Sequence, residues 1–135
     1  MAYADGFLIV VPAKNIEAYR KMSEKAGRVW MEYGALDYKE CVAEDMGAEG
    51  TTFPKTLGTK KSETVVFSWI VYKNRKHRDA VLKNVMADPR ITASMKDKMP
   101  FDPARMLYGG FEVIVDFSAS AAPKKAAAKK KATKR

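Results

Sequence analysis

The sequence has few of the side chains that build metal and disulfide sites. Its 135 residues include one cysteine, Cys41, and one histidine, His77. A single cysteine excludes an intramolecular disulfide and a metal site made of several cysteines. His77 stands between Lys76 and Arg78, with no partner at the spacing that a metal site requires. We therefore expect no metal and no cofactor.

A long hydrophobic run is also missing. The apolar run that includes Phe7 and Val11 is about eight residues long, whereas a helix that spans a bilayer needs about 20. No basic residue precedes this run, although signal peptides begin with a basic segment. These absences predict a cytoplasmic protein without membrane contact.

Acidic residues are absent from the end of the chain. The whole sequence has 25 basic and 16 acidic residues, a net charge of +9. The last twelve residues contain seven of the basic ones: Lys124, Lys125, Lys129, Lys130, Lys131, Lys134 and Arg135. Without these seven, 18 basic residues stand against 16 acidic ones, a net charge of +2. We predict a nearly neutral folded domain over residues 1–118 and a disordered basic tail over residues 119–135.

Two roles are open for this tail. Seven cations can neutralise nucleic-acid phosphates without sequence preference and with a strong dependence on salt. No aromatic residue is interleaved among them, so the tail is not expected to stack on bases. The alternative is a solubilising extension with no dedicated partner.

Hydrophobic periodicity predicts strands and helices in a repeated order. Asn15 and Asn74 stand where an asparagine side chain can cap the first turn of a helix. The expected elements are strands over Tyr3–Val11, Leu36–Glu44, Thr64–Tyr72 and Arg105–Asp116, helices over Asn15–Gly34 and Asn74–Ala87, a long mobile connection over Asp45–Glu63 and a short helical turn over Ile91–Lys98. The strand–helix–strand order occurs twice, which is typical of the α+β ferredoxin-like fold, βαββαβ, with an antiparallel sheet.

The strand over Thr64–Tyr72 is hydrophobic on both of its faces. Val65, Phe67 and Trp69 point to one face, while Val66 and Ile70 point to the other. Two helices cover only one face of a four-stranded sheet, so the other face would expose several large apolar groups. We expect a second copy of the chain to cover it, which gives a homodimer. The alternative is a monomer whose long connection folds over the sheet.

Four segments resemble a family of small bacterial proteins. They are YADGF at residues 3–7, ETVVFSWI at 63–70, DPR at 88–90 and MPFDPARMLYGGFE at 99–112. On these motifs the chain is similar to the YbaA-like family of uncharacterised proteins, in the dimeric α+β barrel superfamily. The resemblance implies a ferredoxin-like protomer that dimerises through its sheet, with any ligand in the cleft between sheet and helices. It carries over no catalytic residue.

Asp5 and Glu112 are the acidic residues chosen as candidates for catalysis. Each lies in an expected strand beside a glycine and an aromatic residue, and the first and last strands are neighbours in the ferredoxin-like order. A partly buried carboxyl group there would have a raised pKa and could act as a general acid or base. The structural alternative is that one or both acids pair with Arg105, Arg90 or a tyrosine hydroxyl at the end of a strand.

Two further motifs have a chemical and a structural interpretation. The glycine pair Gly109-Gly110 lacks the lysine and serine of a phosphate loop, so a bulge or a close backbone approach is favoured. A basic cluster stands at the start of the second helix and could bind an anion together with the free amides of the first turn. Its members are Lys73, Arg75, Lys76 and Arg78. The alternative is a solvated face.

The sequence thus supports two classes of function. The first is a dimeric protein that binds or acts on a small molecule in the cleft between sheet and helices. The second is a non-enzymatic protein that contacts nucleic acid through its basic tail. Whether the chain is an enzyme stays open.

Overall fold

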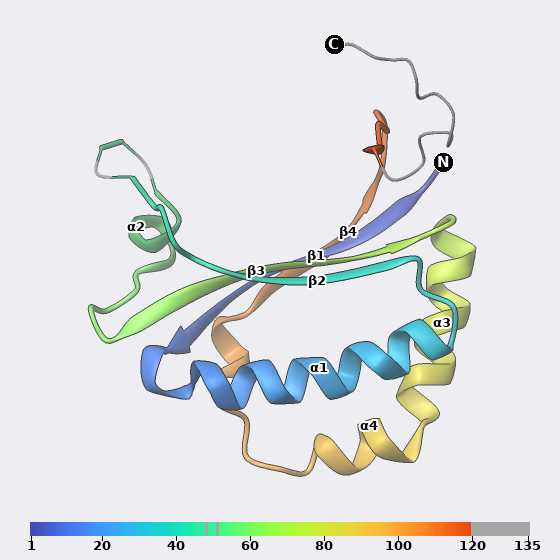
Figure 1. Ribbon diagram of the computed structural model, residues 1–135, viewed down its shortest axis with the longest axis horizontal. Coiled ribbons are helices and arrows are strands. Elements are labelled where there is room, and N and C mark those ends of the chain that lie inside the picture. Colours follow the sequence, from blue (N-terminus) through green and yellow to red (C-terminus); the bar gives the residue numbers. More distant parts are fainter. Residues whose placement is uncertain (48, 51, 120–135) are drawn as a thin grey trace.

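The computed structural model describes residues 1–47, 49–50 and 52–119. The described chain forms one antiparallel sheet with its three longer helices on one side and a short helix on the other (Figure 1). In chain order the elements are β1 (Tyr3–Pro12), η1 (Ala13–Asn15), α1 (Ile16–Glu32), β2 (Asp37–Val42), α2 (Phe53–Leu57), β3 (Glu63–Tyr72), α3 (Arg75–Ala87), α4 (Pro89–Ser94), η2 (Pro103–Arg105) and β4 (Leu107–Glu112).

The sheet has the strand order β2-β3-β1-β4, with every neighbouring pair antiparallel. The two hydrophobic strands β1 and β3 are central, where both of their edges are paired. This order and the two strand–helix–strand units confirm the ferredoxin-like α+β fold that the periodicity predicted.

One face of the sheet packs against α1, α3 and α4 (Figure 1). Two groups of buried side chains lie under these helices, one around Tyr72 and Val85 and the other around Val11 and Val66. Phe7 packs against both groups from the middle of β1. The space between the two groups, on the helix side of the sheet, is where a pocket lies.

Several local expectations differ from the structure. Asn15 precedes α1 but does not cap it with its side chain, because its amide nitrogen donates to the Pro100 carbonyl at 3.0 Å. The connection expected to be mobile contains a short helix, α2, which Thr52 caps by accepting from the Lys55 amide. Gly58 ends α2 in the left-handed conformation, with φ of 65°.

The glycine pair in β4 forms no bulge. Its pairing with β1 is continuous, with Asp5 opposite Gly110 and Gly6 opposite Gly109. A close approach is the reason for glycine at position 110, since a Cβ atom there would lie 2.8 Å from ring atoms of Tyr3. The bulge interpretation is therefore wrong, and the close-approach interpretation explains this glycine.

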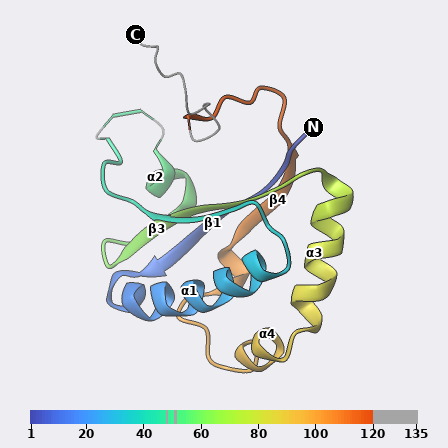
Figure 2. The same cartoon turned by 45° about the vertical axis from the view of Figure 1, so that its right-hand side comes forward.

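The other face of the sheet is only partly covered. Helix α2 lies over one end of it (Figure 2). There Phe53 stacks on Phe67 with ring centres 6.3 Å apart. Phe67, Leu107 and Phe111 remain 48%, 54% and 62% exposed. The long connection therefore covers part of this face and leaves a hydrophobic area in the open.

Two sequence predictions concern membranes and the tail. Among the described residues, no helix combines the length and apolar character needed to cross a bilayer. Nearly all of the predicted basic tail, including its seven cations, lies outside the described residues.

Candidate functional site

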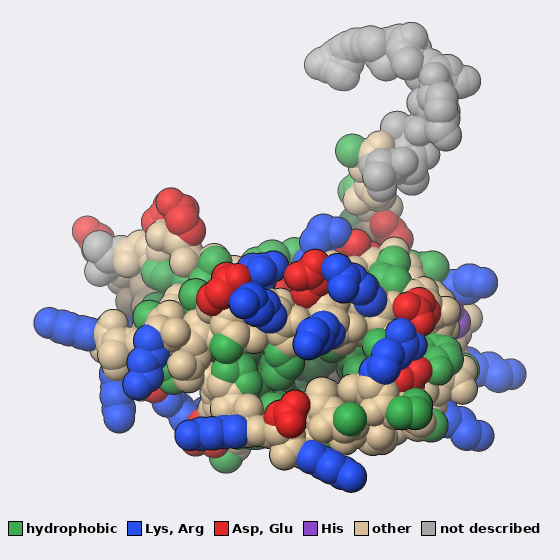
Figure 3. Space-filling view, turned by 60° about the horizontal axis from the view of Figure 1, so that its bottom comes forward, with side chains coloured by type: hydrophobic (Ala, Val, Ile, Leu, Met, Phe, Trp, Pro, Cys, Tyr) green, Lys and Arg blue, Asp and Glu red, His purple; other side chains and the backbone are tan. Residues whose placement is uncertain are grey.

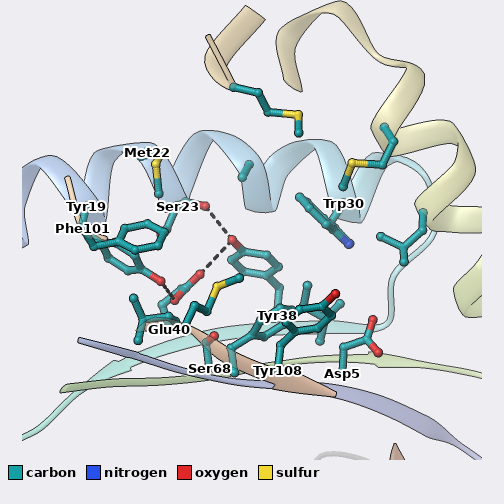
Figure 4. Close-up of a pocket in the computed structure, with 18 of the residues that line it drawn as sticks. Asp5, Tyr19, Met22, Ser23, Trp30, Tyr38, Glu40, Ser68, Phe101 and Tyr108 are labelled. Atoms are coloured by element: carbon teal, nitrogen blue, oxygen red, sulfur yellow. Dashed lines mark hydrogen bonds between the residues drawn. The ribbon is translucent and has the colours of Figure 1, made fainter. Parts of the chain in front are cut away.

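A pocket of about 570 Å³ lies between the inner face of the sheet and the helices. Its wall is mostly aromatic and aliphatic, with four methionines and a small number of polar groups. Figure 4 labels ten of its side chains: Asp5, Tyr19, Met22, Ser23, Trp30, Tyr38, Glu40, Ser68, Phe101 and Tyr108. Phe7 and Arg78 also line it. Most of the other residues that line the pocket are apolar.

The pocket opens to solvent beside α3, α4 and β4. Met86, Met95 and Tyr108, which line it there, are 43%, 61% and 74% exposed. On the helix side of the molecule, charged side chains of both signs surround a hollow with a hydrophobic floor (Figure 3). A small molecule can therefore reach the pocket without unfolding of the sheet.

Glu40 is the acidic group at one end of this pocket. The Tyr19 hydroxyl donates to its Oε1 at 2.8 Å, and the Tyr38 hydroxyl lies 3.0 Å from its Oε2 (Figure 4). Ser68, directly opposite on β3, also hydrogen-bonds the carboxyl group. Burial of the carboxyl group raises the pKa of Glu40 above its ordinary value, and these hydrogen bonds offset only part of the rise. As a whole residue Glu40 is nevertheless exposed, since β2 is an edge strand and the pocket is open.

The hydroxyl of Tyr38 has two possible acceptors and only one proton. Besides Glu40, the Ser23 carbonyl lies 3.1 Å away. When Glu40 is ionised, Tyr38 donates to it; when Glu40 is protonated, Glu40 can donate to Tyr38 and Tyr38 to Ser23. Both protonation states of Glu40 thus leave these groups hydrogen-bonded. Burial also raises the pKa of Tyr38 and of Tyr19, so both stay neutral donors.

Asp5 lies toward the other end of the pocket in Figure 4, and it has a cationic partner. The Arg78 Nη1 atom donates to its Oδ1 at 2.5 Å, and Tyr72 hydrogen-bonds the same carboxylate. Tyr72 in turn accepts from Trp30 Nε1 at 3.0 Å. Burial raises the pKa of Asp5 more than the Arg78 charge lowers it. Asp5 is therefore held in a buried ion pair, which is the structural alternative to a catalytic role. Its partner is Arg78, and not Arg105 or Arg90.

The second candidate acid, Glu112, is not brought into the pocket. It is opposite Tyr3 at the end of β4 and is exposed. The register places Glu112 on the same face as Asp5, but two residues further along the strands, at the end of β4. The two acids thus share a face without sharing a site.

The basic cluster is divided by the structure. Arg78 turns toward Asp5 and lies over the Tyr3 ring at 4.9 Å, whereas Lys73, Arg75 and Lys76 are exposed. Asn74 caps α3 by accepting from the amide of the helix's third residue, so one of the free donors is already occupied. The anion site predicted from this cluster stays a prediction, now without Arg78 as a free cation.

His77 and Cys41 have ordinary surroundings. The His77 ring packs edge-on against Tyr72 and its Nδ1 accepts from the Lys73 amide at 3.0 Å. Cys41 is half-buried on β2 and pairs with Phe67. Within the described part of the chain, no group of three or more His, Cys, Asp or Glu side chains is arranged to hold a metal ion.

The sequence alone did not mark Glu40 or Tyr38 as site residues. Both lie on one face of β2 through its alternation, and an ordinary strand explains that pattern equally well. The one signal for Glu40 in the sequence was its position: an acidic residue in line with Tyr38 and Val42, on one face of the expected strand. Alternation alone cannot say which face of an edge strand is covered.

These features define a class of protein: a ferredoxin-like α+β domain with an open, mainly apolar pocket between its sheet and its helices. The family described as "Protein of unknown function (DUF1428)" matches residues 2–103. The chain belongs to this family. It is 44% identical over 117 residues to "Uncharacterized protein YbaA" of Escherichia coli strain K12, covering 86% of this chain and 99% of that protein. The protein of the same description from Shigella flexneri matches equally well.

Two solved structures are similar in outline. One is an uncharacterized NIPSNAP domain protein from Burkholderia xenovorans, with 16% identity, a TM-score of 0.44 and coverage of 90% of this chain and 98% of that one. The other is the de novo designed protein Foldit4, with 7% identity, a TM-score of 0.44 and coverage of 84% and 99%. The recognition of a YbaA-like family from the four motifs is confirmed by the family match and the 44% identity.

Proposed function

We propose that this protein binds a small, mainly apolar molecule in the pocket between its sheet and its helices. The observation that carries the proposal is the pocket itself. Its volume of about 570 Å³ lies within the range of about 300–1,000 Å³ that is common for ligand sites. Its wall combines large hydrophobic surfaces with few polar groups, the composition by which such sites bind and orient a ligand.

The methionines of the pocket support the same function. Met22, Met86, Met95 and Met106 line it, and Met95 is 61% exposed at its opening. Methionine side chains are unbranched and polarisable, so they can adapt to ligands of different shape. A wall of this kind suits an aliphatic or aromatic ligand.

The two tryptophans allow a direct test. Trp30 lines the pocket, while Trp69 lies on the opposite face of the sheet, opposite Gly6. In the Trp69→Phe variant, Trp30 is the only tryptophan and reports on the pocket. The Trp30→Phe variant is the matched control, because its fluorescence comes from the other face. We expect small aromatic compounds to change the emission of the first variant and not that of the second.

Native mass spectrometry of protein purified from its own host complements this titration. A retained molecule of small mass, lost on mild activation, would identify the natural ligand. An equal response of both tryptophan variants, or no response of either at millimolar compound, would contradict binding in this pocket.

We also propose that two copies pair through the partly covered face of the sheet. Phe67, Leu107 and Phe111 form an exposed apolar area there. The segment after β4 rises on the same side of the sheet (Figure 2), and its Ile114 and Phe117 are 79% and 94% exposed. A monomer seldom leaves so much contiguous apolar surface in water, whereas a two-fold pairing of equal faces would bury it.

The oligomeric state tests this pairing. Sedimentation equilibrium should give twice the chain mass for the wild type. Phe111→Lys should shift the protein to the monomer, because it places a charge in the apolar area. Met31→Lys, at an exposed position on α1, is the matched control and should leave the dimer intact. A wild-type monomer at micromolar concentration would refute the proposal.

The second candidate function, contact with nucleic acid, depends on the charge of the tail. Seven cations and no acid follow Pro123. We expect the full chain to be retained on immobilised duplex DNA at low salt and released as salt rises. Deletion of Lys124–Arg135 should abolish retention, and a tail of equal length with glutamine at the seven positions should behave like the deletion. Retention of either variant would contradict a role of these charges.

A further inference from the structure

Glu40 is an acidic group that faces the pocket without a cation beside it. Within the described part of the chain, the ion pairs involve other acidic residues, such as Asp5 with Arg78 and Glu63 with Arg105. Among the described residues that line the pocket, Arg78 is the one basic residue, and it is engaged by Asp5 and Asp79. With Glu40 ionised, the pocket therefore carries one uncompensated negative charge.

The groups around Glu40 are neutral hydrogen-bond donors and aromatic rings. From α1 come Tyr19 and Ser23, from β2 Tyr38 and from β3 Ser68. These donors hold the carboxylate in one orientation but bring no positive charge. A carboxylate in such a place gains from a cation that enters the pocket, because ion pairing is stronger where water is partly excluded.

The aromatic rings at this end of the pocket fit the same kind of ligand. Tyr19 and Phe101 meet edge to face with ring centres 5.7 Å apart, and Tyr38 lies next to Trp30 at 6.1 Å. In Figure 4 the Tyr19 and Phe101 rings are on one side of Glu40 and the Tyr38 ring is on the other. Faces of aromatic rings attract cations, most strongly where the cation is desolvated.

We infer that the ligand of this pocket is a small organic cation, an amine or ammonium compound with an apolar body, whose charged group sits beside Glu40. The inference rests on the proposed binding of a small molecule and adds the chemical class. The apolar body would lie along Trp30, Phe7 and the methionines, toward Asp5, whose charge is already balanced by Arg78.

Four probes with one apolar body separate the possibilities. They are 2-phenylethylamine, its trimethylammonium analogue, 2-phenylethanol and 3-phenylpropionate, titrated into the Trp69→Phe protein at neutral pH. We expect both cations to bind about tenfold tighter than the alcohol, and the anion to bind weakest. Equal affinity of amine and alcohol would overturn the cation preference while leaving the pocket proposal in place. Failure of all four to bind would overturn both.

The Glu40→Gln variant, made in the same Trp69→Phe background, tests the residue itself. Glutamine keeps the shape: its amide oxygen can accept from Tyr19 while its amide nitrogen donates to Tyr38, whose own proton goes to the Ser23 carbonyl. We therefore expect the fold to be retained and the amine affinity to fall about tenfold. The affinity for the alcohol should change little. Glu17→Gln, at an exposed position on α1, removes the same charge away from the pocket and is the matched control. Unchanged amine binding in Glu40→Gln would refute the assignment.

The dependence on pH supplies a second measurement. The amine binds beside ionised Glu40, so its affinity should fall as the pH falls through the pKa of that group, while the affinity of the alcohol stays level. Tyr19, Ser23, Tyr38 and Ser68, which face Glu40, do not gain or lose a proton in this range. A parallel loss of amine and alcohol binding would show unfolding or a general change of the pocket and would count against Glu40.

Discussion

The substitution Gly27→Ala tests how closely α1 packs on the pocket wall. Gly27 is buried on α1, and a Cβ atom added there would lie 2.8 Å from Cε1 and 2.9 Å from Cδ1 of Tyr38. Carbon atoms pack at about 3.5–4.0 Å, so the ring would have to move by about 0.7 Å or more. Its hydroxyl is held at Glu40 and Ser23, and the ring also contacts Trp30. Movement of the ring therefore disturbs the Glu40 end of the pocket.

Two effects of this substitution oppose each other. Alanine is better than glycine inside a helix by about 1 kcal/mol. An extra methyl group in a filled site costs about 1–3 kcal/mol, because neighbours leave their preferred positions. The ring of Tyr38 is fixed at both ends, so we expect the second effect to be larger. The free energy of unfolding should fall by about 1 kcal/mol.

A double-mutant cycle separates the two effects. In the Tyr38→Ala background the ring is gone, and Gly27→Ala should then stabilise the protein by about 1 kcal/mol. The coupling energy between positions 27 and 38 is therefore expected to be about 2 kcal/mol. Urea unfolding of the four proteins, followed by far-ultraviolet circular dichroism, measures it. Ala18→Gly, at an exposed position on the same helix, measures the propensity difference alone. Equal stabilisation by Gly27→Ala in both backgrounds would refute the packing argument.

Three further predictions concern stability. Gly110→Ala should lower the free energy of unfolding by about 1–3 kcal/mol, as measured by urea unfolding, because the added Cβ meets the Tyr3 ring. Arg78→Met should cost about 3 kcal/mol at neutral pH and less in an Asp5→Asn background, since it leaves Asp5 buried and unpaired; equal costs in both backgrounds would contradict the pairing. Hydrogen bonds from Arg90 lower the pKa of Asp88 below its ordinary value. The stability that Asp88 contributes is therefore present above the ordinary aspartate pKa of about 3.9 and is lost as the pH falls below it. Asp88→Asn should therefore be less stable than the wild type at pH 7, and the difference between their urea midpoints should shrink in acid.

Much of the fold was predictable because it depends on local pattern. The alternation in β3 correctly separated Val66 and Ile70, which face the helices, from Phe67 on the other face. The helix expected over Asn74–Ala87 ends at Ala87 as predicted, and Asp88, the next residue, caps α4. Such features depend on neighbours a few residues away, whose effects can be recognised in the sequence.

The local predictions that were wrong are those in which a contact with a residue distant in the sequence overrides a preference of the local sequence. Asn15 was expected to cap α1, but its side chain reaches Pro100, 85 residues further along the chain. Gly110 was expected to mark a bulge or a close approach; it forms no bulge and makes room for the Tyr3 ring across the sheet. In both cases the residue was recognised as structurally important, but only packing decides which group it contacts.

The candidate site shows the same division. The sequence by itself determined the ferredoxin-like order of elements, the hydrophobic inner face of the sheet and the separation of charge toward the end of the chain. Only the tertiary structure decided which acid belongs to the pocket. Glu40 meets Tyr19 because α1 packs across β2, and Asp5 is neutralised because α3 brings Arg78 to it over a separation of 73 residues. Periodicity assigns a side chain to a face, but its electrostatic partner depends on which elements meet there.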